Sequence, residues 1–235
     1  MPSKRTYGDA CGIARALDLV GERWALLVVR ELMLGPKRFT DLRGGLANLS
    51  PDVLAQRLRD LEDAGIVRRR TMPPPTPARV YELTDWGHEL EPVLFALGRW
   101  GSRAPFPPGA AELGVDALIV ALQTTFDPAA AERKAATYEL RLAGQTFTAR
   151  VREGRLELAR ATPEDPDAVI ESDPATLTAV LWHGRWRAEA ERDGDLTIDG
   201  SRAAAGRFLK LFPPPTPAAE TSGVGTSLQP QARPT

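Results

Sequence analysis

Residues 39–82 read FTDLRGGLANLSPDVLAQRLRDLEDAGIVRRRTMPPPTPARVYE, and the chain is organised around this segment. The spacing of its apolar residues predicts a short helix over 39–46 and, after a turn, a second helix over 50–64. Residues 66–83 predict two strands, because proline cannot join a strand ladder and residues 73–77 must form the loop between them. The predicted order is therefore helix, turn, helix and β-hairpin.

That order is the outline of a winged helix-turn-helix, in which the second helix enters the major groove of DNA. Ser50 is a suitable N-cap for this helix, because its hydroxyl can accept from a free backbone N–H. Gly65 suits a left-handed C-cap. The buried face is predicted to carry three leucines at helical spacing: Leu54, Leu58 and Leu61.

The opposite face of the second helix carries side chains that can read bases. Glutamine can pair with adenine, and arginine with guanine, in the major groove. The predicted DNA contacts of this helix are Ser50, Asp52, Val53, Gln56, Arg57 and Arg59. The alternative is an ordinary amphipathic helix whose mixed-charge face is simply solvated.

Basic residues flank this helix at two other places. Lys37 and Arg38 precede the first helix of the pair and Thr40 lies in it, at a position that crosses the DNA backbone in such units. These three are predicted phosphate contacts, and the alternative is that the two basic residues are simply solvated in an exposed loop. Arg79, at the tip of the hairpin, is expected to enter the minor groove or to meet phosphate.

Three more helices are predicted in the front half, over residues 11–20, 22–34 and 85–100. The first is expected to bury Ile13, Leu17 and Val20. The last carries a short heptad-like apolar seam, which Pro92 should kink or loosen. We predict that this seam forms a dimer contact, and the alternative is packing on the chain's own first helix. The seam consists of Trp86, Leu90, Val93, Leu97 and Trp100.

The length of the chain and the distribution of its charge indicate two domains of different net charge. The chain has 235 residues, room for two domains, and 43% of them are apolar. Residues 1–103 carry net charge +3 (16 Lys and Arg against 13 Asp and Glu), and residues 104–235 carry −4 (14 against 18). A basic front half fits local DNA contact. No long apolar stretch or signal-peptide pattern is present, so we expect no membrane span and a cytoplasmic location.

The chain is predicted to divide into four parts: a winged domain over 1–103, a linker over 104–111, a second domain over 112–212 and a disordered tail over 213–235. The second domain reads as a strand meander with helices on one face, so the fold class is α+β. Its predicted strands are 138–142, 146–151, 155–160, 169–171 and 196–198, and its predicted helices are 112–125, 176–183 and 201–212.

Residues throughout the front half carry a family resemblance. They are Cys11, Ala14, Leu17, Asp18, Gly21-Glu22-Arg23-Trp24, Leu32 to Gly35, Phe39, Leu42, Ser50-Pro51, Leu54, Arg57-Leu58, Leu61, Gly65-Ile66-Val67, Tyr81-Glu82-Leu83-Thr84, Gly87 and Leu97. With them the front half resembles the HxlR-type family of bacterial winged-helix regulators. The resemblance implies a homodimer on inverted-repeat DNA, joined through the terminal helices. Asp52 departs from the family pattern, which often has a basic residue there.

The back half carries a looser pattern: Tyr138-Glu139-Leu140, Val151, Glu153-Gly154, Asp167-Ala168-Val169-Ile170, Leu177, Leu181 and residues 196–200. These residues make it similar to sterol-carrier-type (SCP2-like) domains. That family encloses an apolar tunnel, so the resemblance implies a hydrophobic or lipid effector. Ordinary core packing also explains the apolar spacing. No cluster of titratable residues typical of an enzyme is present, so we expect neither catalysis nor a cofactor.

Cys11 is the single cysteine, which excludes an intrachain disulfide. It begins the first predicted helix, where the helix N-terminus favours the reactive thiolate and nearby Asp9 opposes it. The family resemblance implies a sensor of oxidants or electrophiles, and the alternative is a small buried residue. His88 and His183 are isolated in the sequence, so no metal site is expected.

Three functions follow from these patterns. The leading one is a DNA-binding regulator whose second domain binds a hydrophobic effector. The second is a redox-responsive regulator that acts through Cys11, with the second domain stabilising the dimer. The third is a lipid carrier or an enzyme that keeps the winged unit only for dimerisation. The enzyme version lacks an evident nucleophile–base pair or phosphate loop.

Overall fold

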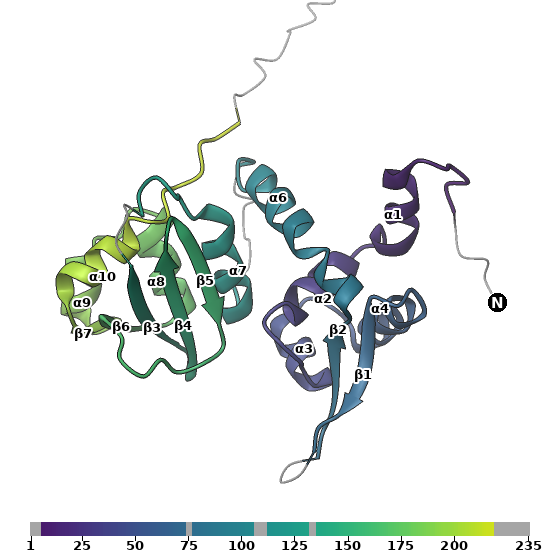
Figure 1. Ribbon diagram of the computed structural model, residues 1–235, viewed down its shortest axis with the longest axis horizontal. Helices are drawn as coiled ribbons and strands as arrows, with labels where there is room; N and C mark the ends of the chain where they lie inside the picture. The colour runs from purple at the N-terminus through teal and green to yellow at the C-terminus, as the bar shows by residue number, and fades with distance from the viewer. Residues whose placement is uncertain (1–5, 74–76, 106–111, 132–134, 219–235) are drawn as a thin grey trace, which may run out of the picture.

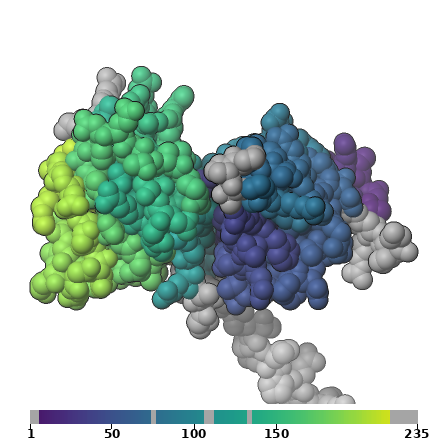
Figure 2. Space-filling model, turned by 90° about the horizontal axis from the view of Figure 1, so that it is seen from below, coloured from purple at the N-terminus to yellow at the C-terminus, as the bar shows by residue number. Residues whose placement is uncertain are grey.

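A computed structural model describes residues 6–73, 77–105, 112–131 and 135–218 (Figure 1). The chain forms two bodies, one built by the front half and one by the back half, which Figure 2 shows as two masses in contact. The predicted linker falls mostly, and the predicted tail largely, outside the described residues. None of the helices among the described residues could span a lipid bilayer.

The front body contains the predicted helix-turn-helix and hairpin. Its elements are α1 (Gly12–Val20), α2 (Ala25–Leu32), α3 (Phe39–Gly45), α4 (Pro51–Asp63), β1 (Val67–Thr71), β2 (Arg79–Leu83), α5 (Asp85–His88) and α6 (Glu91–Gly101). The two strands are antiparallel, with Val67 opposite Leu83, and they project from the helices (Figure 1). Leu54, Leu58 and Leu61 are buried in one core with α2, which confirms the predicted inner face of α4.

Two predicted helices of the front body have different bounds. The helix expected over 22–34 begins at Ala25, because Trp24 takes a left-handed backbone conformation with φ 78° that an α-helix cannot continue. The helix expected over 85–100 is two helices, α5 and α6. Pro92 lies in the first turn of α6, where its missing N–H costs no hydrogen bond, so it starts a helix rather than kinking one.

The predicted buried face of α1 is wrong for two of its three residues. Val20 is buried, but Ile13 is 72% exposed and Leu17 is 43% exposed. Helix α1 projects from the rest of the front body, so its own chain leaves much of its apolar surface uncovered (Figure 1).

The back body is a five-stranded sheet packed with helices. Its elements are α7 (Val115–Thr125), β3 (Ala136–Leu142), β4 (Gln145–Arg152), β5 (Arg155–Ala159), β6 (Ala168–Ser172), α8 (Pro174–Trp182), α9 (Arg187–Asp193), β7 (Leu196–Gly200) and α10 (Arg202–Leu209). The strand order is β5-β4-β3-β6-β7, with β3 and β6 parallel and the other neighbours antiparallel. The α+β prediction is confirmed for this body, but the predicted meander holds only for β3, β4 and β5, because β6 crosses over to pair with β3 in parallel. Helix α9 was not predicted.

One face of this sheet carries the core. Alternate residues such as Leu140, Phe147 and Ile170 are fully buried and share one cluster with Phe208 of α10. Tyr138 and Phe208 stack in a tilted arrangement with ring centroids 4.6 Å apart. Burial raises the pKa of Tyr138, and the adjacent Arg207 acts in the opposite direction. Large side chains therefore fill the space between sheet and helices.

Helix α7 joins the two bodies. It packs against α6, α2 and α3 on one side and against β5 and α8 on the other. A Cβ atom at Gly98 of α6 would lie 3.0 Å from Thr124 Cγ2 of α7, so the two helices approach closely at that glycine. The back body is thus packed directly against helices of the helix-turn-helix unit.

Candidate nucleic-acid interface

Helix α4 turns one face away from the core of the front body. Ser50 caps it through a hydrogen bond that its Oγ accepts from Val53 N–H at 3.4 Å. Gly65 follows the helix with φ 71°, a left-handed conformation that confirms the predicted stop. Because the leucine face is buried, Asp52, Val53 and Gln56 are exposed, with Val53 at 40%.

Polar contacts hold the exposed side chains of α4 in the DNA-free chain. Gln56 Nε2 donates to Asp60 Oδ1 at 2.8 Å, and Arg59 Nη2 donates to Gln56 Oε1 at 2.7 Å. These bonds lie on an exposed surface, where exchanging them for water or for base edges costs little. The arrangement presents an amide and a guanidinium side by side, two groups suited to adenine and guanine.

Arg57 is mostly buried, unlike its neighbours Gln56 and Arg59 on α4. Only 15% of its side chain is exposed, and its Nη1 atom lies 3.4 Å from Glu22 Oε2 and 3.2 Å from Asp60 Oδ2. The pair with Glu22 ties α4 to the chain segment that precedes α2, and the pair with Asp60 lies within α4. Arg57 therefore serves contacts within the front body in this conformation.

Arg38 and Thr40, at the start of α3, are exposed as expected. Asp41 closes the first turn by accepting from the backbone N–H of Arg38 at 3.1 Å. This carboxylate holds the start of α3 and lies close to the predicted phosphate contacts.

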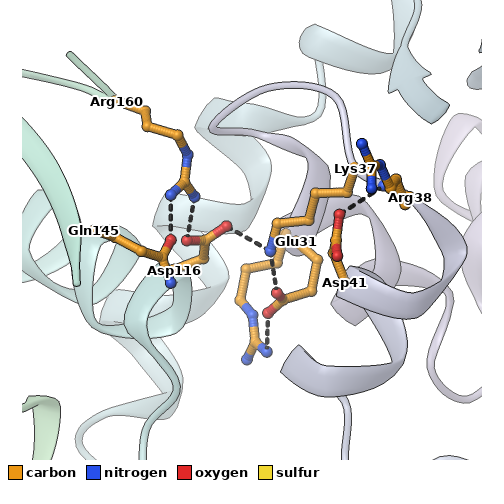
Figure 3. Close-up of polar contacts among 8 residues, drawn as sticks. Glu31, Lys37, Arg38, Asp41, Asp116, Gln145 and Arg160 are labelled. Atoms are coloured by element: carbon orange, nitrogen blue, oxygen red, sulfur yellow. Dashed lines mark hydrogen bonds and ion pairs between the residues drawn. The ribbon is translucent and has the colours of Figure 1, made fainter. Parts of the chain in front are cut away.

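Lys37 lies in a charged cluster between the two bodies instead of an exposed loop (Figure 3). Its side chain is 14% exposed, and its Nζ atom lies 2.7 Å from Glu31 Oε2 and 2.5 Å from Asp116 Oδ2. The alternative of a solvated loop lysine is wrong, because the lysine pairs with Glu31 and Asp116, which are themselves buried, and Asp116 belongs to the back body. Glu31 was overlooked, although a carboxylate inside the apolar run of α2 signals a buried charge that needs a partner.

The hairpin carries a row of arginines, most of which are paired within the chain. Glu82 contacts Arg68 at 2.8 Å and Arg70 at 3.1 Å, and Arg69 contacts Glu62 at 2.7 Å. Tyr81 and Glu62 raise the pKa of Arg69 above its usual value. Arg79 is exposed and has no ion-pair partner among the residues that the structure describes. Its charge is therefore available to a ligand.

The predicted seam is exposed in the single chain. No residue of α6 is buried, and the exposed fraction is 53% for Val93, 45% for Leu97 and 73% for Trp100. Trp86 of α5 is 49% exposed, and Leu90 is half-buried in the front core. These side chains and those on the exposed face of α1 are apolar groups that the described part of the chain leaves uncovered.

Cys11 occupies the N-cap position of α1, and its side chain is exposed. Its backbone N–H donates to Asp9 Oδ1 at 2.9 Å, so Asp9 closes the turn before the helix. The predicted alternative of a small buried residue is wrong, since the thiol is open to solvent.

The back body has an open cavity of about 860 Å³ between α8, α9 and α10. Basic and apolar side chains line it, among them Trp186, Arg207 and Lys210. Trp186 is 77% exposed, which is unusual for the largest apolar side chain.

Comparison with known proteins identifies the family that the front half resembles. A profile described as HxlR-like helix-turn-helix matches residues 19–105. The uncharacterized HTH-type transcriptional regulator YvaP of Bacillus subtilis is 40% identical over 89 residues, which is 37% of this chain and 82% of that protein. The HTH-type transcriptional regulator YodB of the same organism is 38% identical over 89 residues, which is 37% of this chain and 79% of that protein.

Solved structures of YodB align with less than half of this chain. The reduced form has 32% identity and a TM-score of 0.37, over 44% of this chain and 100% of that one. A quinone-bound form has 34% identity and a TM-score of 0.34, over 38% of this chain and 93% of that one. The sequence matches to YvaP and YodB cover most of each relative. The HxlR-like profile spans the helix-turn-helix and its hairpin. The chain belongs to the HxlR-like helix-turn-helix family of transcriptional regulators.

Proposed function

We propose that this chain binds inverted-repeat DNA as a homodimer, with α4 in the major groove and the hairpin beside it. The observation that carries the proposal is the outward face of α4, where Gln56 and Arg59 lie together opposite a fully buried leucine face. A helix held in this way can enter the groove without exposing the core. The proposed contacts are Arg38, Thr40, Ser50, Asp52, Val53, Gln56, Arg59 and Arg79.

Two predicted contacts, Lys37 and Arg57, stand apart from this proposed set. Both are mostly buried and paired with carboxylates in the structure of the free chain. Breaking such pairs has a cost that DNA must offset. Asp52 is exposed at the start of α4 and repels phosphate, so its role is to restrict where the helix can approach the backbone.

The homodimer is supported by the exposed apolar surface on α1, α5 and α6. Burying an apolar side chain contributes about 25 cal/mol for each Å² removed from water, so Trp100, Val93 and Leu97 offer a substantial gain to a second copy. Two-fold association would also pair two recognition helices for two half-sites.

The test of DNA binding is a fluorescence-anisotropy titration of the full chain with its own upstream region, in competition with a shuffled duplex of equal length. The proposal predicts that the upstream duplex binds at least about 1,000-fold more tightly than the shuffled one at physiological salt. Equal affinity for both duplexes would refute sequence-specific regulation and favour the carrier function.

For the back body we propose a hydrophobic effector site, as its resemblance to SCP2-like domains implies. The filled core means that an apolar chain would have to displace buried phenylalanines, whereas the cavity beside Trp186 is already open. A titration with fatty acids should then shift the tryptophan fluorescence of the wild type and leave the fluorescence of Trp186→Phe unchanged. A shift of equal size in both proteins would place the ligand elsewhere.

A second candidate function, thiol-based sensing, is favoured by the exposure of Cys11 on the same helix as the apolar dimer surface. Modification there would add bulk beside the proposed dimer contact. The quinone-bound form of its relative YodB suggests the reagent. Quinone should release DNA from the wild type and leave Cys11→Ala bound. If both proteins release DNA equally, Cys11 is not the sensor.

A further inference from the structure

The charged cluster between the two bodies joins them through one lysine (Figure 3). On the front side, Glu31 Oε1 lies 2.7 Å from Arg30 Nη2, and Glu31 Oε2 lies 2.7 Å from Lys37 Nζ. On the back side, Asp116 Oδ2 lies 2.5 Å from the same Lys37 Nζ, and Asp116 Oδ1 lies 2.6 Å from Arg160 Nη2. Lys37 is thus shared by a carboxylate from each body.

The two carboxylates and the lysine that they share are largely shielded from water. The exposed side-chain fraction is 2% for Glu31, 3% for Asp116 and 14% for Lys37. Arg160 is fixed further by Gln145 and by the Phe147 ring, whose centroid lies 4.7 Å from the guanidinium carbon. Buried ion pairs are screened weakly by salt and hold their geometry, because a charge that loses its partner there is strongly penalised.

The backbone of Lys37 belongs to the DNA-binding unit. Its N–H donates to Tyr81 O at 2.9 Å, and its carbonyl accepts from Tyr81 N–H at 2.8 Å, which ties it to strand β2 of the hairpin. Arg38 and helix α3 follow directly. Lys37 therefore stands between two elements that approach the DNA backbone in a winged helix, while its side chain is turned to the back body.

We propose that docking of the back body is autoinhibitory: Asp116 withholds Lys37 from the DNA phosphates, and release of Asp116 returns that contact. The inference rests on the proposed function, since it concerns how DNA binding is regulated. Within the front body only the side chain of Lys37 has to move on release, because two hydrogen bonds to Tyr81 fix its backbone. The back body, with its acidic excess, also supplies the carboxylate that competes with phosphate for this lysine.

The first experiment measures duplex binding by the full-length Asp116→Asn variant over a range of salt concentrations. One added phosphate contact steepens the slope of log K against log salt by about 0.9, which corresponds to about eightfold tighter binding at 0.1 M salt. The double variant Asp116→Asn/Lys37→Met should lose this gain. Asp199→Asn is the matched control, because it removes the same charge at β7, the far edge of the sheet, and should bind as the wild type does.

Two further variants distinguish autoinhibition by Asp116 from a general loosening of the contact between the two bodies. Arg160→Met removes the other cation of Asp116 and leaves Lys37 as its remaining ion-pair partner, so no gain in DNA affinity is expected. Lys37→Met alone should keep the salt slope of the wild type, because the docked lysine makes no phosphate contact. This second comparison can still overturn the proposal if Asp116→Asn fails to fold, which near-UV circular dichroism would reveal.

Three results would overturn the proposal: no gain with folded Asp116→Asn, a gain that survives loss of Lys37, or a lower salt slope for Lys37→Met alone. Phosphate contacts are independent of sequence, so all variants are measured on the shuffled duplex as well. Failure to prefer the upstream region would therefore refute the proposed function and leave this test intact. Absence of binding to every duplex would refute both.

Discussion

At the scale of single residues, the ion pairs of Glu31 beside α3 depend on a glycine at position 45, which has no side chain. A Cβ atom at Gly45 would lie 2.2 Å from Glu31 Oε2, whereas one at Gly44 would meet nothing within 4 Å. Both glycines lie in the last turn of α3. Glycine at position 45 thus leaves the space that the buried carboxylate of Glu31 occupies.

This difference predicts opposite effects for two alanine substitutions. Gly44→Ala should raise the free energy of unfolding by about 0.5–1 kcal/mol, since alanine favours a helix over glycine. Gly45→Ala should lower it by about 1 kcal/mol or more, because displacing Glu31 separates a buried charge from its partners. Urea unfolding of both variants checks this. Equal stabilisation by both would mean that Glu31 moves without cost.

Asp173 is a second residue with a measurable role, as the N-cap of α8. Its Oδ1 accepts from Thr176 N–H at 2.8 Å, and its Oδ2 accepts from the Thr176 hydroxyl at 2.7 Å. Burial alone would raise the pKa of Asp173, but these hydrogen bonds and those of neighbouring backbone N–H groups together hold it below its usual value. The ionised form is therefore bound more tightly in the folded chain than in the unfolded one.

A carboxyl whose pKa is lowered by folding stabilises the protein above its unfolded pKa, and this contribution is lost as the pH falls through the folded value. Asp173→Ala should cost about 0.5–2 kcal/mol at neutral pH and clearly less near pH 2. Ser201→Ala is the control, because it removes an uncharged N-cap from α10 and its cost should not depend on pH. Equal costs of Asp173→Ala at both pH values would contradict the assignment.

At the scale of elements, the outward face of α4 and the hairpin have separate tasks. Arg79→Ala should weaken binding to every duplex and reduce the salt slope by about one unit, because a phosphate contact carries no sequence information. Gln56→Ala should instead change base preference by about 1–3 kcal/mol. Salt titrations on upstream and shuffled duplexes separate these effects, with Arg192→Ala on α9 as a charge control. Equal losses on all duplexes for both variants would mean that Gln56 does not read bases and that a different face of α4 enters the groove.

The exposed apolar side chains of α6 are proposed to form the dimer contact. Leu97→Glu places a charge in the exposed apolar surface and should convert the dimer into a monomer, because a buried unpaired carboxylate strongly disfavours association. Sedimentation equilibrium measures the change. Ala188→Glu adds the same charge to exposed α9 and should leave the association unchanged. A wild-type chain that is monomeric at micromolar concentration would contradict the proposed dimer.

At the scale of the whole molecule, local signals explain what the sequence predicted well. Ser50 and Gly65 bound α4 through contacts within a few residues, and the buried leucines follow from helical spacing. The strands of the back body also follow from alternation between turn glycines such as Gly144 and Gly154, both in left-handed conformations. These features need no knowledge of the rest of the fold.

The features that the sequence did not predict depend on distant or missing partners. Lys37 is buried by Asp116, which lies in the other body, and no local pattern links the two. Helix α9 buries only Ala190, so its polar sequence shows no apolar period. Ile13 of α1 looks like a core residue, yet the chain alone does not cover it.

Two copies of this chain are proposed to read two DNA half-sites with α4. Hydroxyl-radical footprinting of the upstream region with the full chain measures whether they do. We expect two protected segments whose centres are about 10 base pairs, or a multiple of that, apart, and protection that weakens or moves with Gln56→Ala. A single protected segment, or uniform protection unaffected by Gln56→Ala, would contradict it.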